Sequence, residues 1–155
     1  MFFLKRIYYK VVYGGASRPG NFEIEILEAI ANALNQDQQN IIRRQIKNIF
    51  LVQKEHENKM IRYTINKDLC ESFFFRNPEE DLVLAEASYT LDGFKNKVQV
   101  TLYEGYLFSM ESNTQITKRE LRRKPEDIQV EIVLLPCSGK SIAEILDEDE
   151  HPDYE

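Results

Sequence analysis

The chain has 155 residues, of which 43% are hydrophobic and 30% charged, and this size and balance fit a single globular domain with its own core. No apolar run approaches the roughly 20 residues that cross a bilayer. Two cysteines, Cys70 and Cys137, are too few for a disulfide framework, and two histidines exclude a histidine-rich metal centre. The first residues place apolar side chains ahead of the positive charges, the wrong order for a secretory signal, so we expect a cytoplasmic protein.

The net charge of -6 is concentrated at the C-terminal end of the chain. Residues 144–155 hold seven of the 26 acidic residues and no Lys or Arg, so the rest of the chain, with its 20 basic residues, is close to neutral. Because like charges at this density repel one another and resist packing, we expect residues 147–155 to form a solvated acidic tail. A docking arm for a basic partner is the alternative interpretation of this segment.

A second charged segment, residues 118–124, has the opposite sign. Its five basic residues are Lys118, Arg119, Arg122, Arg123 and Lys124. Such groups can contact phosphates and release counterions from nucleic acid. No aromatic residues interleave with them to stack on bases, however, and the chain is not basic overall. We therefore predict a solvated connection between two strands rather than a nucleic-acid interface.

The N-terminal residues 2–13 are amphipathic, and their apolar side chains recur at helical spacing. Alternation in residues 7–13 also suits a strand, but a helix is favoured. Packing of its apolar stripe against the core is the favoured interpretation, over attachment to a membrane surface. The glycines and proline of residues 14–20 then interrupt any regular structure.

Two helices are predicted after this break. Asn21 is expected to cap the first, which buries one apolar stripe. The stripe consists of Phe22, Ile26, Leu27, Ile30, Ala33 and Leu34. Asn35 or Asp37 separates it from a second helix, in which Ile42, Ile46 and Ile49 face inward. The short connection predicts that the two helices are antiparallel neighbours.

From about Ile49 the hydrophobic period changes to two, which predicts strands. Residues 56–59 are expected to form the loop of a first hairpin, residues 82–92 a further strand, and Glu104-Gly105 a tight turn between two more. Residues 128–135 form the last predicted strand, which Pro136 ends, and residues 141–146 a short helix.

This order of elements predicts an α+β domain over residues 1–146, with the N-terminal helices packed on one face of an antiparallel, meandering sheet. The order is analogous to that of cystatin-like and NTF2-like folds, in which a curled sheet wraps a helix. A short C-terminal helix and the acidic tail of residues 147–155 follow.

Motifs that would carry chemistry are incomplete. Residues 138–141 lie between a strand and a helix, as a phosphate-binding loop does, but Leu134 stands where that pattern requires glycine. Cys70 and His56 are the one nucleophile–base pair available, and nothing in the sequence brings them together. Alternation places Glu86, Glu104 and Glu111 on a solvated face. We therefore predict no catalytic, cofactor-binding or metal-binding residues.

The leading functional hypothesis is a non-enzymatic binding, adaptor or inhibitor-like protein that uses an exposed sheet face or the acidic tail. It rests on the 17 aromatic residues, and above all on Phe73, Phe74 and Phe75, which cannot all point to one face of an extended chain. A protein partner or a second copy of the chain would cover such a patch. Nucleic acid and membrane surfaces are the less favoured partners.

The alternative hypothesis is a small-molecule-binding protein, or an enzyme, with a pocket inside the curled sheet. Its candidate pocket residues are Tyr63, Glu86, Tyr89 and Tyr103.

Overall fold

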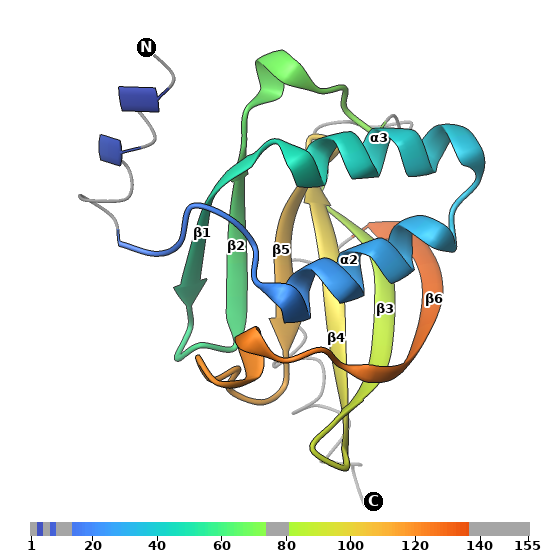
Figure 1. The fold of residues 1–155 in the computed structure, drawn as a ribbon. Helices are drawn as coiled ribbons and strands as arrows, with labels where there is room; N and C mark the ends of the chain where they lie inside the picture. The colour runs from blue at the N-terminus through green and yellow to red at the C-terminus, as the bar shows by residue number, and fades with distance from the viewer. Residues whose placement is uncertain (1–2, 5–6, 9–13, 74–80, 137–155) are drawn as a thin grey trace, which may run out of the picture.

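The computed structural model describes residues 3–4, 7–8, 14–73 and 81–136, and it has the α+β architecture that the sequence predicts. Two helices, α2 (Asn21–Asn32) and α3 (Gln36–Lys47), come first and run antiparallel to each other (Figure 1). Six strands follow: β1 (Ile49–Glu55), β2 (Met60–Ile65), β3 (Leu82–Leu91), β4 (Phe94–Tyr103), β5 (Tyr106–Ser112) and β6 (Glu126–Pro136). The predicted change of backbone geometry at Ile49 is confirmed.

All neighbouring strands in the sheet are antiparallel, in the order β1-β2-β5-β4-β3-β6. The meander is continuous from β3 to β5, whereas β2 pairs with β5 and the last strand, β6, lies beside β3. The predicted turns are present at residues 56–59 and at Glu104-Gly105. Gly105 has a φ of 81°, and Glu104 before it has a φ of 52°, which is the backbone of a tight hairpin turn.

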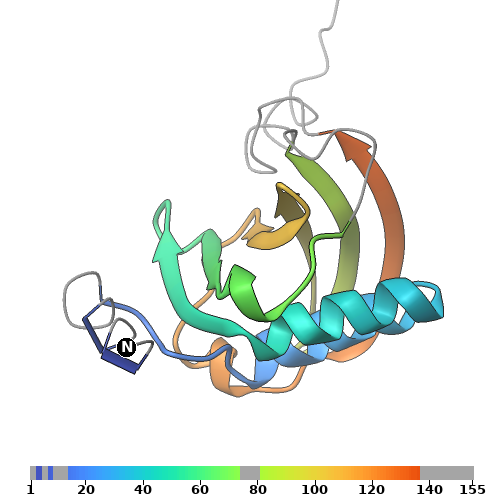
Figure 2. The same ribbon diagram turned by 90° about the horizontal axis from the view of Figure 1, so that it is seen from above.

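The sheet is strongly curved, and the two helices lie across its concave side (Figure 2). Irregularities in strand pairing, such as the one between Val83 and Ala85 on β3, accompany this curvature. The apolar side of α2 (Phe22, Ile26, Leu27 and Ile30) is completely buried against the sheet. Ring contacts extend this core, since Phe22 meets Tyr89 of β3 edge to face with 5.0 Å between ring centroids.

The start of α2 differs from the prediction by one residue. Gly20, not Asn21, is the N-cap, and its N–H donates to the Glu23 carboxylate over 2.8 Å. A side chain at position 20 would not fit, because a Cβ there would lie 2.6 Å from the Leu121 carbonyl oxygen. At its other end α2 stops at Asn32, so Ala33 is exposed and Ala31 is buried instead.

Helix α3 is capped by Asn35, which accepts a hydrogen bond from the Gln38 N–H over 3.0 Å. Its inward face contains a completely buried polar side chain, Gln45. The Gln45 Nε2 donates to the carbonyl oxygens of Glu71 (2.8 Å) and Gly105 (2.9 Å), and the Oε1 accepts from the Leu107 N–H (2.9 Å). Two of these hydrogen bonds attach α3 to the β4–β5 turn and the start of β5, and the third attaches it to the segment after η1 (Lys67–Leu69). Ile49, expected on this helix, instead begins β1.

Of the predicted N-terminal helix, the structure describes Phe3, Leu4, Ile7 and Tyr8, and the rest of residues 2–13 lies outside the described residues. These four residues are helical, but they are 45–70% exposed, so their predicted packing on the core is wrong. Within the described ranges, no helix combines the length and the apolar content that crossing a membrane requires. Several predictions lie outside the described residues: Phe74, Phe75, Cys137, the loop of residues 138–141, the C-terminal helix and the acidic tail.

Replacing Gln45 with leucine should destabilise the protein strongly although the two side chains are of similar size. The buried Leu107 N–H would lose its acceptor, and we expect a loss of about 2 to 3 kcal/mol in the free energy of unfolding, measured by urea titration. The matched control is Gln36→Leu at the exposed start of the same helix, which should change that free energy by less than about 0.5 kcal/mol. Equal effects of the two substitutions would contradict this role for Gln45.

Candidate functional site

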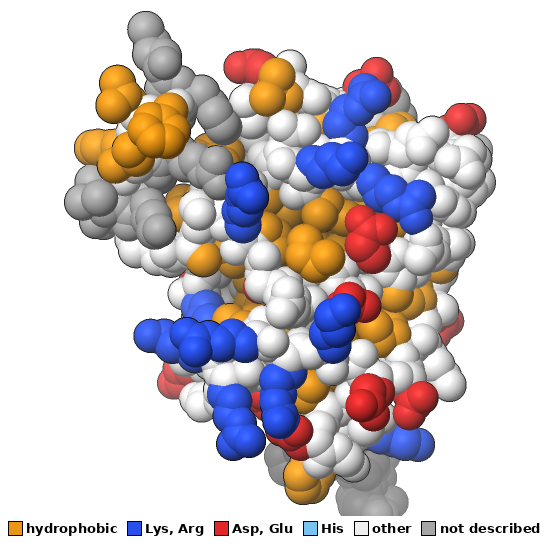
Figure 3. All heavy atoms as spheres, in the orientation of Figure 1, with side chains coloured by type: hydrophobic (Ala, Val, Ile, Leu, Met, Phe, Trp, Pro, Cys, Tyr) orange, Lys and Arg blue, Asp and Glu red, His pale blue; other side chains and the backbone are white. Residues whose placement is uncertain are grey.

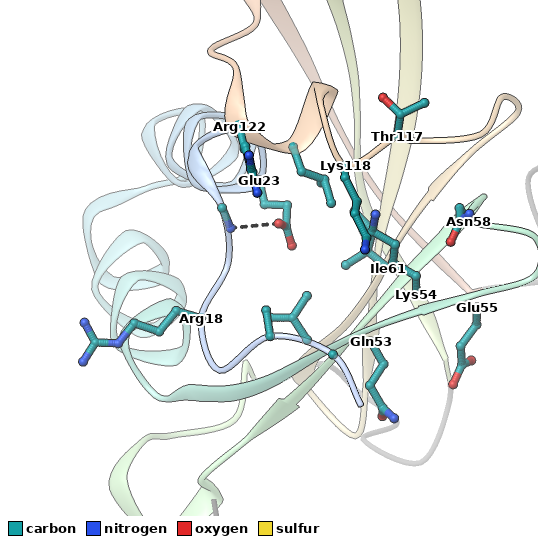
Figure 4. A pocket seen from close by; sticks show the side chains of 15 residues that line it. Arg18, Glu23, Gln53, Lys54, Glu55, Asn58, Ile61, Thr117, Lys118 and Arg122 are labelled. Carbon is teal, nitrogen blue, oxygen red and sulfur yellow. Dashed lines mark hydrogen bonds between the residues drawn. The ribbon is translucent and has the colours of Figure 1, made fainter. Parts of the chain in front are cut away.

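A hollow of about 860 Å³ lies where the start of α2 meets β1, β2 and the segment that contains η2 (Glu120–Arg122) (Figure 4). Its volume is typical of a site for a small molecule. The charged lining residues are Arg18, Glu23, Lys54, Glu55, Lys118 and Arg122. Val52, Ile61 and Leu121 contribute apolar walls.

Pairing at the edge of the sheet builds one wall of the hollow. Ala16 and Val52 exchange two backbone hydrogen bonds, of 2.9 and 2.8 Å, which hold the chain before α2 against the edge of β1. Gly15 makes this approach possible, because it has a φ of 90° and a Cβ there would lie 2.3 Å from the Val52 carbonyl oxygen. Lys54 lies two residues after Val52, opposite Ile61 of β2, and therefore shares the side of the strand that faces the helices.

The segment between β5 and β6 builds the opposite wall. The Ile116 N–H donates to the Asn58 carbonyl oxygen over 2.9 Å, which ties the segment to the β1–β2 turn. Thr117 and Glu120 form a reciprocal cap, in which the Thr117 N–H donates to the Glu120 carboxylate over 2.6 Å. The segment then reaches the start of α2, and this path places Lys118 and Arg122 at the hollow.

The buried carboxyl group of Glu23 lies at the wall of the hollow, and the side chain is only 2% exposed. Its Oε2 accepts the Gly20 N–H, while its Oε1 is buried and has no partner with hydrogen-bond geometry among the described residues. The Tyr63 hydroxyl is also buried without a partner of full hydrogen-bond geometry, but it lies close enough to this carboxyl to favour its ionised form. Burial raises the pKa of Glu23, and the Gly20 hydrogen bond, Tyr63 and Lys54 only partly oppose it.

Three cations surround this carboxyl. Figure 4 shows Lys54, Lys118 and Arg122 around the same space as Glu23, whereas Arg18 points away from it. In the part of the chain that the structure describes, none of these three forms an ion pair.

The electrostatics of Lys54 reflect this crowding of positive charge. Partial burial lowers its pKa, Lys118 lowers it further, and Glu23 and Glu120 raise it. Glu55 does not neutralise the hollow, because it pairs with Arg62 at 3.2 Å. Figure 3 shows that Lys and Arg side chains gather on this face of the molecule, over η2 and the end of β1.

The basic segment of residues 118–124 is a solvated connection between strands, as predicted, but its residues have different surroundings. Lys118 and Arg122 line the hollow, and Arg119 is exposed. Arg123 pairs with Asp92, and the Lys124 Nζ lies 3.4 Å from the Glu25 carboxylate. Only part of the segment is therefore available at the hollow.

The predicted pocket residues do not line this hollow. Tyr63 and Tyr89 are buried in the core, and Glu86 pairs with Lys97 at 2.5 Å. Tyr103 is exposed beside Phe108, and together with Tyr63 it lines a separate hollow of about 280 Å³ over β2 and β5. Of the predicted interaction residues, Phe73 is 2% exposed, and its N–H donates to the Gly105 carbonyl oxygen.

The carboxylates expected on a solvated face divide into two groups. Glu86 and Glu104 are partly or largely exposed, and Glu104 pairs with Lys67 at 3.2 Å. Glu111 contradicts the expectation, since it is only 8% exposed and the Ser109 hydroxyl donates to it over 3.4 Å. Glu111 therefore lies at a buried position of β5 and not on a solvated face.

Other chemistry has little support in the described part of the chain. His56 lies in the β1–β2 turn and Cys70 follows the other end of β2, so the strand separates them. Burial raises the pKa of the Cys70 thiol, which disfavours the reactive thiolate. No three His, Cys, Asp or Glu side chains among the residues described are grouped as metal ligands would be.

Glu23, Lys54 and Arg18 were not predicted from the sequence as components of a site. In the sequence, Glu23 is an acid in the first turn of a helix, which is a common position for one. Its spacing from Gly20, three residues before it, is that of a capping box, and this was the one local signal available. The burial of Glu23 depends on contacts with β1 and η2, which the spacing does not reveal.

Comparison with known proteins identified no matching family model, no similar curated protein and no similar solved structure. The candidate site is therefore interpreted from its own geometry.

Replacing Glu23 with glutamine should remove a pH-dependent loss of stability. Because the folded protein holds the Glu23 proton more tightly than the unfolded chain, the free energy of unfolding contributed by this group falls as the pH rises above its ordinary pKa of 4.5. Glutamine keeps a side-chain acceptor for the Gly20 N–H and does not titrate. We expect Glu23→Gln to gain stability relative to the wild type as the pH rises from about 4 towards neutrality, measured by urea titration at each pH.

The second variant, Glu23→Leu, separates capping from titration. It should lose the same pH dependence but be less stable than Glu23→Gln at every pH, by about 1 kcal/mol, because the N-cap hydrogen bond is gone. A pH dependence that both variants retain would assign it to another group.

Proposed function

We propose that this protein binds a small anionic ligand in the hollow between α2, β1 and η2 and acts as a non-enzymatic binding protein. The observation that carries the proposal is the convergence of Lys54, Lys118 and Arg122, with no ion pair to any described residue, on a hollow of about 860 Å³. This function is of the same class as the small-molecule alternative of the sequence analysis, but it uses a different set of residues at the edge of the sheet.

Electrostatics favour an anion over other ligands. Lys54 and Lys118 repel each other, and a ligand anion between them would relieve this repulsion. Charge-assisted hydrogen bonds from ammonium and guanidinium groups to an anion are among the strongest in proteins. The apolar walls formed by Val52, Ile61 and Leu121 suit a ligand with an apolar body attached to its charged group.

Binding is favoured over catalysis by the chemistry of the lining. The lining residues described include no Ser, Cys or His, and the Thr117 hydroxyl oxygen accepts the Glu120 N–H over 3.2 Å. The cystatin-like or NTF2-like element order, the domain boundary at residue 146 and the cytoplasmic location remain predictions that agree with a small binding protein.

Hexyl sulfate is a suitable probe, because it carries a fixed negative charge on an apolar chain. We expect it to bind the wild type, and Lys54→Gln and Lys118→Gln each to weaken binding by about tenfold, measured by isothermal titration calorimetry. Lys95→Gln at the exposed start of β4, away from the hollow, is the matched control and should leave the affinity unchanged. Raising the salt concentration should weaken binding.

Hexan-1-ol tests whether the charge matters, and we expect it to bind far more weakly than hexyl sulfate. Equal binding of the two probes, or hexyl sulfate affinities that the Lys54 and Lys118 substitutions leave intact, would refute the proposal.

A second candidate function, association with a protein partner or a second copy of the chain, is supported by β6. Among the described strands, only β3 pairs with it, so its other edge has no described partner strand. Several apolar side chains on this strand are half-exposed, and Leu135 is 60% exposed. An open edge of this kind is a template for pairing with another strand.

Association through β6 predicts that the apparent mass in sedimentation velocity rises with protein concentration. Leu135→Lys adds a charge at this exposed position and should shift the population towards monomer without changing the fold, measured by circular dichroism. A wild-type chain that sediments as a monomer at every concentration would rule out self-association at this edge.

A further inference from the structure

The Glu23 carboxyl is the one acid that the structure places both inside the core and at the wall of the hollow. Its environment is defined on every side. Lys54 faces it from β1, and the Tyr63 hydroxyl faces it from β2. The η2 segment contributes Lys118, Glu120 and Arg122. The residues before α2 contribute the Gly20 N–H and Arg18, which points away from the carboxyl. Any charge that enters the hollow therefore changes the free energy of ionising Glu23.

The buried groups beside the hollow are sensitive to the charge inside it. Glu23 Oε1 and the Tyr63 hydroxyl are both buried and lie near each other, although neither has a partner with full hydrogen-bond geometry among the described residues. After a small side-chain rotation the Tyr63 O–H can donate to an ionised Glu23, so the ionised carboxyl can be accommodated while no ligand is bound. An incoming anion would lie next to this buried negative charge, which is costly, whereas a protonated Glu23 avoids the repulsion.

We infer that anion binding in this hollow is coupled to the uptake of one proton by Glu23. The inference rests on the proposed function, and it adds that pH regulates the affinity for the ligand. Without ligand, Lys54, Lys118 and Arg122 favour the ionised carboxyl. When an anion occupies the space between them, it offsets their positive charge, and the carboxyl takes a proton from solution. No covalent bond is formed or broken in the ligand.

The sign of the pH dependence follows from this linkage. Because the complex holds one more proton than the free protein, affinity is highest when the pH is low and falls as the pH rises through the range in which free Glu23 ionises. Burial already raises the pKa of Glu23, which moves this range towards neutrality. The direction is opposite to that of a site in which a carboxylate binds the ligand.

Lys54 is the other group that can take up a proton, because its pKa is lowered by partial burial and by Lys118. An anion would favour its charged form as well. The substitution Lys54→Arg separates the two sources, since arginine keeps the positive charge and does not lose its proton in this pH range.

The experiment titrates hexyl sulfate into the full-length protein in a calorimeter, in two buffers of different ionisation enthalpy. Hexyl sulfate does not itself exchange protons near neutral pH, so the difference between the two buffers reports protons bound by the protein. We expect net proton uptake by the wild type and an affinity that falls about tenfold from about pH 5 to about pH 8. Lys54→Arg should still show net proton uptake on binding, and loss of the uptake in this variant would assign it to Lys54 instead of Glu23.

Glu23→Gln should abolish proton uptake, flatten the pH profile and bind hexyl sulfate about tenfold more tightly than the wild type at about pH 8. Circular dichroism verifies that the variant is folded. If the variant does not fold, the proton uptake of the wild type still tests the inference. Binding without proton uptake by the wild type, or uptake that persists in Glu23→Gln, would overturn the inference while leaving the proposed function intact. Failure of hexyl sulfate to bind at any pH would overturn both.

Discussion

The burial of one carboxyl group, that of Glu23, constrains the whole corner of the molecule in which the hollow lies. Its hydrogen bond to the Gly20 N–H starts helix α2, and the same side chain closes the interior between the helix and the sheet. The chain reaches this point along β1, to which Ala16 is bonded, and passes so close to Leu121 that position 20 admits only glycine. Helix, sheet edge and η2 segment are therefore positioned together.

Burial and charge oppose each other at this corner. Removing the Glu23 carboxyl from water disfavours its ionised form, whereas the nearby Lys54 favours it. Lys54 and Lys118 in turn disfavour each other's charge. A surface lysine would be freely hydrated and its interactions weak, but partial burial of Lys54 makes these energies larger. The protonation state of Glu23 is therefore set by opposing influences, and a charge that enters the hollow changes their balance.

The parts of the fold that local rules control could be predicted from the sequence. The change of hydrophobic period at Ile49 and the turns at residues 56–59 and at Glu104-Gly105 depend only on nearby residues, and the structure has them at those positions. The pairing of β2 with β5 and the return of β6 to β3 are contacts between distant segments, and no local pattern specifies them. The same distinction explains Ala33, whose spacing fits the buried stripe although the helix ends one residue earlier.

Almost all of the candidate site depends on contacts between segments that are distant in the sequence. Lys118 and Arg122 were noticed in the sequence because basic residues cluster there, yet their neighbours Arg123 and Lys124 are paired elsewhere, and spacing alone does not separate the two groups. Lys54 and Glu23 are ordinary residues in sequence, a polar position on a strand and an acid in a first turn. They become unusual because contacts between distant segments, such as the hydrogen bond between Ile116 and Asn58, bring the η2 segment next to them.

The two ends of the interior are closed in different ways. At the β4–β5 turn, Gln45 satisfies the Leu107 N–H and donates to two carbonyl oxygens, so both ends of its buried amide have partners. At the opposite end, where α2 begins, one oxygen of Glu23 accepts the Gly20 N–H, and the other lies near the Tyr63 hydroxyl without full hydrogen-bond geometry. A fully paired polar group fixes a structure, whereas an incompletely paired one costs stability until a proton or a ligand completes it. This asymmetry is the physical reason to propose ligand binding at the hollow rather than at the β4–β5 turn.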